Sequence, residues 1–125
     1  MDLARTFDRD RIPGAKLRRE DITNALNTGL GNTRILLLPT TPTLAPRLGM
    51  DPRRDGANAE YYPRTLSQTA LAGLPGLPEV SMPLLEISGV PMGVSLIGGE
   101  KQDRALLALA REVEKKADFH AGKPL

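Results

Sequence analysis

The side chains of this chain that could do chemistry are few, and the serines are the first to consider. Its candidate nucleophiles are Ser67, Ser81, Ser88 and Ser95. A nucleophilic serine needs a base within hydrogen-bond reach and donors that hold the oxyanion. None of these serines stands in a Gly-x-Ser-x-Gly or Gly-Gly-Ser-Ser context, and none has an activating neighbour in the sequence. We therefore expect no catalytic residue in this chain.

Metal and cofactor chemistry has as little support. His120 is the single histidine, it stands in a polar tail beside Gly122, and the chain has no cysteine. One histidine with scattered carboxylates does not supply the ligand set that a zinc site requires. We expect a solvated His120, no metal site and no cofactor.

Two features could meet an anion. Gly98-Gly99 comes just before a predicted helix, where free backbone N–H groups can hold a phosphate or carboxylate. A tight strand-to-helix turn explains the same glycines without a ligand. Arg64 and the Arg53-Arg54 pair are read as solvated charges. We expect a structural turn at the glycines and surface roles for the arginines.

Charge and composition exclude several kinds of partner. Seventeen Lys and Arg residues face fifteen Asp and Glu residues, which leaves a formal charge of only +2. So small a charge does not indicate a nucleic-acid partner. No apolar run approaches the roughly 20 residues that cross a bilayer, and the N-terminus lacks the apolar run of a signal peptide. We expect no membrane partner and a cytoplasmic location.

The pattern of apolar residues predicts an α/β fold with a partial mixed sheet of about three strands flanked by helices. Short apolar runs bounded by Pro and Gly indicate buried strands, and apolar residues at helical spacing indicate helices. The strands are expected over residues 34–39, 79–84 and 92–97, with a turn at 87–89, and the helices over residues 18–30, 63–74 and 102–117. Residues 1–17 are expected to form a flexible arm before a single domain at 18–125.

Two of these elements carry more detailed expectations. The run Ile35–Leu38 has no polar alternation, so it is expected to be covered on both faces. In the helix at 63–74, Leu66, Ala70 and Gly73 are expected to line the inward face. In the last helix the inward stripe is expected to hold the apolar residues Leu106, Leu109, Ala110, Val113 and Ala117.

The candidate substrate-binding residues follow the first strand. The extended segment Thr40–Thr43 leaves the end of that strand, where ligands of α/β proteins tend to bind, and Thr41 lies in it. A long polar loop covers residues 47–60, and loops of that length are often functional. Tyr61 and Tyr62 flank this loop. They could contact substrate, or they could bury their rings against the start of the next helix.

Three motifs together resemble the amidase signature family, the serine amide hydrolases. Residues 36–46 read Leu-Leu-Leu-Pro-Thr-Thr-Pro-Thr-Leu-Ala-Pro, an apolar strand followed by Pro-Thr and Ala-Pro. Leu71-Ala72-Gly73 and residues 76–83, Gly-Leu-Pro-Glu-Val-Ser-Met-Pro, match a second family segment. Residues 89–99, followed by Asp103 and Leu106-Leu107, match its strand, glycine turn and closing helix. The resemblance covers residues 18–117 and corresponds to the C-terminal part of the family.

The resemblance implies amide hydrolysis by a Ser–cis-Ser–Lys arrangement. Those residues belong to a glycine- and serine-rich region in the N-terminal part of the family, and no stretch of this chain matches it. In the tRNA-dependent glutamine amidotransferase branch, an acid on the helix before Leu-Ala-Gly helps to hold the amino acid. Residues 64–69, Arg-Thr-Leu-Ser-Gln-Thr, contain no acid. This departure favours general amidases that act on small carboxamides.

Three functional hypotheses remain open at this stage. The chain could be the C-terminal portion of an amidase, inactive alone because the Ser–cis-Ser–Lys region is absent, with a small amide substrate only once that region is supplied. It could be a non-catalytic docking or assembly subunit that completes a separate amidase chain or self-associates, because an isolated piece of sheet would expose apolar surface and a bare edge. It could also be a truncated gene product.

Overall fold

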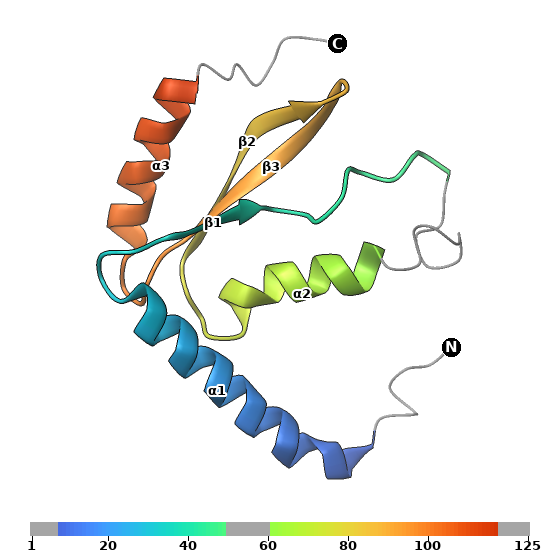
Figure 1. Cartoon of the computed structure of the whole chain (residues 1–125), viewed down its shortest axis with the longest axis vertical. Coiled ribbons are helices and arrows are strands. Elements are labelled where there is room, and N and C mark those ends of the chain that lie inside the picture. Colours follow the sequence, from blue (N-terminus) through green and yellow to red (C-terminus); the bar gives the residue numbers. More distant parts are fainter. Residues whose placement is uncertain (1–7, 50–60, 118–125) are drawn as a thin grey trace.

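The computed structural model describes residues 8–49 and 61–117 and contains three α-helices and a three-stranded sheet (Figure 1). A single 3-10 turn, η1, covers Arg9–Arg11. The elements that follow are α1 (Ile12–Leu30), β1 (Leu36–Pro39), α2 (Tyr61–Gly73), β2 (Glu79–Ile87), β3 (Val90–Ile97) and α3 (Asp103–Ala117). These elements confirm the α/β fold class, with three strands flanked by helices.

The sheet has the strand order β1-β3-β2, and both pairings are antiparallel. β1 and β2 therefore run parallel to each other, but β3 lies between them. The described sheet is antiparallel throughout where a mixed sheet was expected, because the return strand of a hairpin occupies the place in which a parallel pair would have formed. Helix α2 lies on the connection between the two outer strands.

The hairpin of β2 and β3 is the most local unit of the fold. Its two-residue turn consists of Ser88 and Gly89, with φ of 52° and 80°. Positive φ at both central positions gives the turn whose twist matches the flanking strands, and glycine adopts it without strain. Ile87 then pairs with Val90. The turn confirms the sequence prediction, and the pairing extends both strands beyond the expected 79–84 and 92–97.

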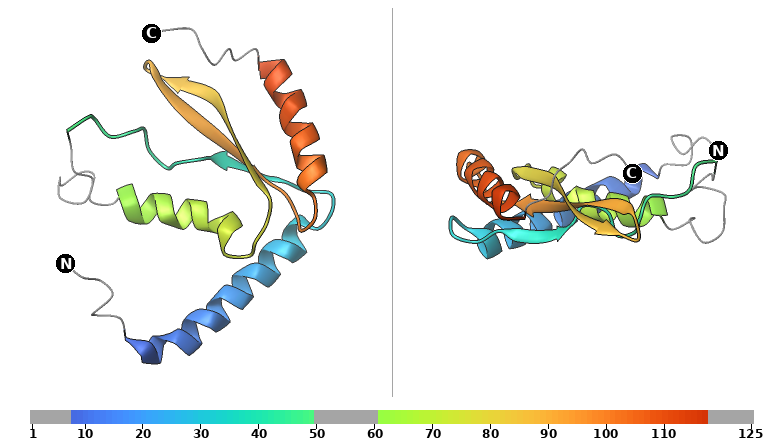
Figure 2. Two further views of the ribbon diagram at one scale, coloured as in Figure 1. Left: turned by 180° about the vertical axis from the view of Figure 1, so that it is seen from behind. Right: turned by 90° about the horizontal axis from the view of Figure 1, so that it is seen from above.

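Helix α3 covers one face of the sheet with an apolar contact. Leu106 and Ala110 are buried against Met82 and Leu96, and Val80, Leu84 and Val113 pack around them. Leu106, Ala110 and Val113 therefore confirm three of the five residues of the predicted inward stripe. Leu109 and Ala117 are exposed, so the stripe is narrower than expected. Figure 2 shows α3 alongside the hairpin of β2 and β3.

The opposite face carries α1 and α2. Leu30, Ala72, Leu77 and Ile97 form its buried cluster, with Leu26, Leu36, Leu38 and Leu71 packed around them. Helix α1 begins at Ile12, before the expected start at residue 18, because Pro13 suits the first turn of a helix. Its first half is exposed on all sides and extends away from the sheet (Figure 1). Residues 1–7 of the expected arm lie outside the described residues.

The prediction for the inward face of α2 was wrong for Leu66 and Gly73, which are exposed, whereas Ala70 is half-buried. Leu66 is 61% exposed, whereas Thr65, Gln68 and Ala72 face inward. Two contacts set this rotation. The side-chain amide of Gln68 donates to the carbonyl oxygen of Pro39 at the end of β1, and the small Ala72 packs into the apolar cluster.

The prediction that β1 is covered on both faces was also wrong within the described residues. Leu36 and Leu38 are half-buried, but Leu37 is 62% exposed and Ile35 is exposed as well. Each face of β1 needs its own covering layer, and only the α2 side supplies one here. In the described ranges nine apolar residues are buried, while twelve large apolar residues are exposed. The fold therefore leaves much apolar surface in contact with solvent.

Gly98 and Gly99 form a tight turn between β3 and α3, and we call it the corner because the end of α1 packs against it. Gly98 donates its N–H to the carbonyl of Pro78, and Gly99 lies against the carbonyl of Gly31, the residue that caps α1. A side chain on Gly99 would overlap the carbonyl oxygen of Gly31. Both glycines of the pair are buried. Close backbone packing therefore accounts for them, which supports the structural interpretation of Gly98-Gly99.

Candidate functional site

A row of three hydroxyl groups crosses the sheet at the point where β1 ends. The Oγ1 atom of Thr40, the residue after β1, lies 2.7 Å from Ser81 Oγ on β2 and 2.9 Å from Ser95 Oγ on β3. Ser95 is completely buried, Thr40 is half-buried and Ser81 is exposed. We call these three residues the hydroxyl row. It links all three strands through side chains.

Strand alternation places the row on the α2 face. Leu36, Leu38 and Thr40 follow one another at every second position, so they share one face. Ser95 is the cross-strand partner of Leu38 on one side and of Ser81 on the other. This face is therefore apolar near the corner and becomes polar toward the end of β1.

Gly93 allows Thr40 to sit over the sheet. The N–H of Thr40 donates to the carbonyl of Gly93 at 2.8 Å, which adds one rung to the ladder. A Cβ atom on Gly93 would lie 2.7 Å from Thr40 Oγ1 and 3.1 Å from Ser81 Oγ. Any side chain at this position would displace the hydroxyl row. The absence of a side chain at Gly93 is thus a condition for the row to form.

A β-bulge lies next to the row. The register between β2 and β3 shifts between Met82 and Leu85, so Pro83 and Leu84 stand opposite Gly93 alone. Pro83 has no N–H to give to a ladder, which suits the unpaired position of a bulge. Bulges re-aim side chains and are frequent next to active sites. Here the bulge begins two residues after Ser81.

Helix α2 approaches the same end of the sheet. The bond from Gln68 to Pro39 fixes its middle above the end of β1. Thr65, one turn earlier on that face, has a buried Oγ1 atom with no hydrogen-bond partner among the described residues. Tyr61 is a further turn back, at the start of the helix. Figure 1 shows this start on the same side of the molecule as the segment that leaves β1.

Of the three residues predicted to bind substrate, Thr41 lies just after the end of β1, and Tyr61 and Tyr62 begin α2. Thr41 is half-buried, and its hydroxyl donates to the carbonyl of Thr43 at 2.9 Å, so that hydroxyl serves the local turn. Tyr61 is half-buried and Tyr62 is exposed, with their rings edge to face and 6.2 Å between centroids. Partial burial of Tyr61 fits the packing alternative equally well. Substrate contact by these three residues stays a prediction.

Sequence reasoning missed the hydroxyl row itself. Ser81 and Ser95 were considered only as nucleophiles, and the extended Thr40–Thr43 segment was represented by Thr41 rather than Thr40. A signal was present, because a two-residue turn at 88–89 places residues 87 and 90 opposite each other. Counting back along both strands brings Ser81 close to Ser95, although the bulge moves the pairing by one residue. The contact with Thr40 had no such local signal.

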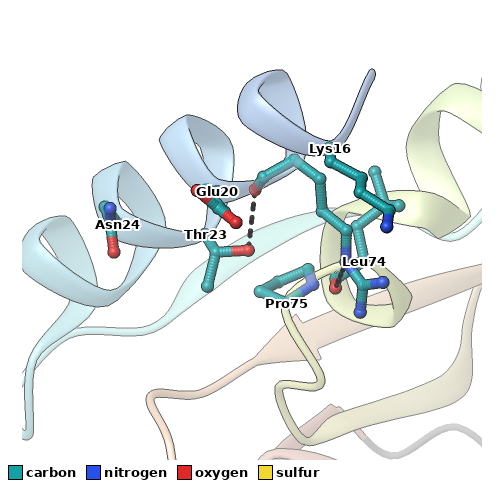
Figure 3. Close-up of a pocket in the computed structure, with 7 residues that line it drawn as sticks. Lys16, Glu20, Thr23, Asn24, Leu74 and Pro75 are labelled. Carbon is teal, nitrogen blue, oxygen red and sulfur yellow. Dashed lines mark hydrogen bonds between the residues drawn. The ribbon is translucent and has the colours of Figure 1, made fainter. Parts of the chain in front are cut away.

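A separate open groove of about 600 Å³ lies between α1 and the turn after α2 (Figure 3). It is lined by Lys16, Arg19, Glu20, Thr23, Asn24, Leu74 and Pro75. The Nε atom of Arg19 donates to the carbonyl of Leu74 at 3.0 Å, and the Thr23 hydroxyl donates to the carbonyl of Arg19. The groove carries charges of both signs on exposed side chains. The bond from Arg19 ties α1 to the turn after α2, whereas the bond from Thr23 lies within α1.

Other sequence features add little to the site. Within residues 8–49 and 61–117, no three acidic or histidine side chains gather where they could hold a metal ion. In the same ranges, no helix has the length and hydropathy needed to span a bilayer. His120, and residues 50–60 of the long loop with Arg53-Arg54, lie outside the described residues. In the part of the chain that the structure describes, the hydroxyl row has no base among its hydrogen-bond partners, so its evident chemistry is to donate and accept hydrogen bonds.

Comparison with known proteins places this fold. The family model described as Amidase matches residues 3–107. A glutamyl-tRNA(Gln) amidotransferase subunit from Ectopseudomonas mendocina is 35% identical over 119 residues, which cover 94% of this chain and 23% of that protein. The corresponding subunit from Neisseria meningitidis is 29% identical over 119 residues, 94% of this chain and 24% of the relative.

Solved structures agree with the sequence matches. The same amidotransferase subunit from Thermotoga maritima superposes with a TM-score of 0.70 at 31% identity, covering 82% of this chain and 22% of that one. A crystal structure of an amidase gives a TM-score of 0.69 at 27% identity, covering 88% of this chain and 26% of that one. The amidotransferase subunit and the amidase thus superpose on this chain with nearly equal TM-scores.

The extent of the matches is as informative as their identity. The chain spans about a quarter of the length of the curated relatives it matches, and it corresponds to their C-terminal part. The fold and the hydroxyl row described above therefore belong to one section of a larger architecture. With a family model that covers most of its length, this chain belongs to the amidase family.

Proposed function

We propose that this chain is the C-terminal section of an amide-hydrolysing enzyme and is inactive by itself. In this proposal, the Ser–cis-Ser–Lys residues implied by the family come from a preceding section, and this chain completes the sheet and one wall of the substrate site. The reaction is hydrolysis of the carbon–nitrogen bond of a small carboxamide. Thr41, Tyr61 and Tyr62 are the proposed substrate contacts from this chain.

One observation carries the proposal. A family-like fold leaves large apolar side chains in solvent on several surfaces, including Leu37 on β1 and Leu66 on α2. Exposed apolar patches in a protein normally mark surfaces that another chain or segment covers. The remaining three-quarters of an amidase is the segment that would fill this role. The hydroxyl row and the end of β1 would then face into the completed enzyme.

Fragment complementation tests this function. The chain is mixed with the N-terminal three-quarters of the Ectopseudomonas mendocina relative, and ammonia release is measured from propionamide, benzamide and glutamine. We expect no turnover by the chain alone and turnover by the complex, lost when the signature serine of the partner fragment is replaced by alanine. Turnover by the chain alone would refute the proposal, as would an inactive complex that has formed stably.

The substrate class is tested in the same assay. Helix α2 approaches the proposed wall, and residues 64–69 hold no acid to bind the amino group of an amino acid. We expect the complex to hydrolyse propionamide or benzamide with a higher kcat/KM than glutamine. A preference for glutamine would instead assign the chain to amidotransferase chemistry, in line with the names of its relatives.

A second candidate is a docking subunit without a catalytic role, whose task is to complete an assembly around a separate amidase chain. The exposed outer edge of β1 favours it, because a bare strand edge with Leu37 beside it promotes association. Sedimentation of the purified chain should show self-association that Leu37→Lys reduces. A monomer at all concentrations, combined with failed complementation, would leave the truncated gene product as the interpretation.

A further inference from the structure

The hydroxyl row has a direction that follows from counting its protons. Each of the three hydroxyls can donate one hydrogen bond, but the row contains only two bonds, both of them to Thr40 Oγ1. One hydroxyl proton is therefore left over in any arrangement. Where that proton lies decides which residue presents a free donor.

Burial settles the choice. Ser95 is completely buried, and among the described residues Thr40 Oγ1 is the only hydrogen-bond partner of its hydroxyl. If Ser95 accepted from Thr40, its own proton would be buried with no acceptor, which is costly. If both serines donated to Thr40, the Thr40 proton would have no acceptor among the described residues. The arrangement Ser95 to Thr40 to Ser81 avoids both costs and leaves the spare proton on exposed Ser81.

The surroundings of Ser81 indicate what it would meet. Glu79 stands two positions earlier on the same face of β2, about 7 Å away at the usual strand rise. Its carboxylate disfavours an anionic ligand. The bulge that begins after Met82 and the buried Oγ1 of Thr65, which has no partner in the described ranges, lie at the same end of this face. Beside the spare proton of Ser81, Thr65 Oγ1 is thus one further polar atom that lacks a partner among the described residues.

We infer that Ser81 is a pre-oriented hydrogen-bond donor for the carbonyl oxygen of a neutral carboxamide, with Thr40 and Ser95 acting as positioning residues that fix its proton outward. This assignment rests on the proposed function, since it names a further substrate contact of that site. It adds a donor whose direction is set by its bond to Thr40 and by the bond of Thr40 to Ser95.

The first test uses the chain as it is. Acetamide and acetate are titrated into the isotope-labelled chain, and chemical shifts are followed by NMR. We expect acetamide to shift the Ser81 signals selectively, acetate to do so less, and the response to vanish in Thr40→Val but remain in Thr40→Ser. Ser67→Ala is the matched control, because the Ser67 hydroxyl bonds only locally to the carbonyl of Pro63. Shifts spread evenly over exposed residues, or an unchanged response in Thr40→Val, would overturn the inference.

The second test uses the complemented enzyme. Removing one neutral hydrogen bond should raise KM for the amide by about three- to tenfold in Ser81→Ala and in Thr40→Val, with kcat little changed and Thr40→Ser close to the original enzyme. A merely structural role would lower the amount of active complex without changing KM, and would count against the inference. An inactive complex removes the proposed function, and the acetamide titration still decides the role of Ser81.

Discussion

The two faces of the sheet are built from the same strands but differ in what covers them. Under α3, every second residue of β2 and β3 is apolar, and the contact is closed by Leu96, Met82, Leu106 and Ala110. On the α2 face, the apolar cluster extends along β1 as far as Leu38, and the hydroxyl row lies beyond it. The first arrangement suits stability alone. The second combines a shorter core with side chains that can direct hydrogen bonds, which suits recognition.

The largest expected effect tests the α3 face. Leu106 is 2% exposed, so Leu106→Ala removes a buried side chain and should lower the free energy of unfolding by about 2–5 kcal/mol. The neighbouring Leu107 is 52% exposed, and Leu107→Ala is the matched control with an expected change within about 0.5 kcal/mol. Urea unfolding of both variants measures the difference. Equal losses would show that α3 does not hold the sheet as described.

Substitution at the corner, where Gly99 packs against Gly31, should lower stability almost as much. Gly99→Ala forces a methyl group into the carbonyl oxygen of Gly31, and such overpacking costs about 1–3 kcal/mol or more. Gly29→Ala is the opposite control. Its Cβ meets nothing within 4 Å and the position is helical, so it should stabilise the chain by about 0.5–1 kcal/mol. Thermal unfolding should therefore shift in opposite directions, and two shifts of one sign would contradict the corner packing.

The smallest expected loss concerns the hydroxyl row. Gly93→Ala places a Cβ atom 2.7 Å from Thr40 Oγ1 and should cost about 1 kcal/mol by disturbing a net hydrogen bond at the end of β1. Gly98→Ala, whose Cβ would stand 3.4 Å from Gln102 Cβ, is the control with less disturbance. Amide exchange at Thr40 should rise in Gly93→Ala alone. Unchanged exchange there would mean that the row does not depend on an open Gly93.

The elements that the sequence predicted well are those whose signals are local. The turn at Ser88-Gly89, the closing helix and the inward pair Leu106 and Ala110 depend on residues a few positions apart. The faces of α2 and β1 were not predicted, because they depend on what lies opposite. Leu66 has the right residue type for a core, yet Gln68 sets the rotation of its helix by reaching the carbonyl of Pro39.

The candidate site shows the same division. Its location at the end of the first strand followed from the extended segment after Leu38. Thr41 belongs to that segment, whereas Tyr61 and Tyr62 lie at the start of α2. The hydroxyl row needed the pairing of β1 with β3, which no local pattern encodes. The bulge between Met82 and Leu85 then moves the register by one, so counting from the turn alone places Ser81 next to the wrong neighbour.

The central position of β3 has a consequence for the order in which the chain assembles. The hairpin can close through a two-residue turn, whereas β1 must find β3 across a long separation, with Thr40 and Ser95 lying 55 positions apart. Closing so long a loop costs more entropy and is slower than closing a hairpin. We therefore expect the hairpin to form first and β1 to join it later. Thr40, which orients Ser81 in our inference, directly follows β1, so local opening of that strand would also release the donor.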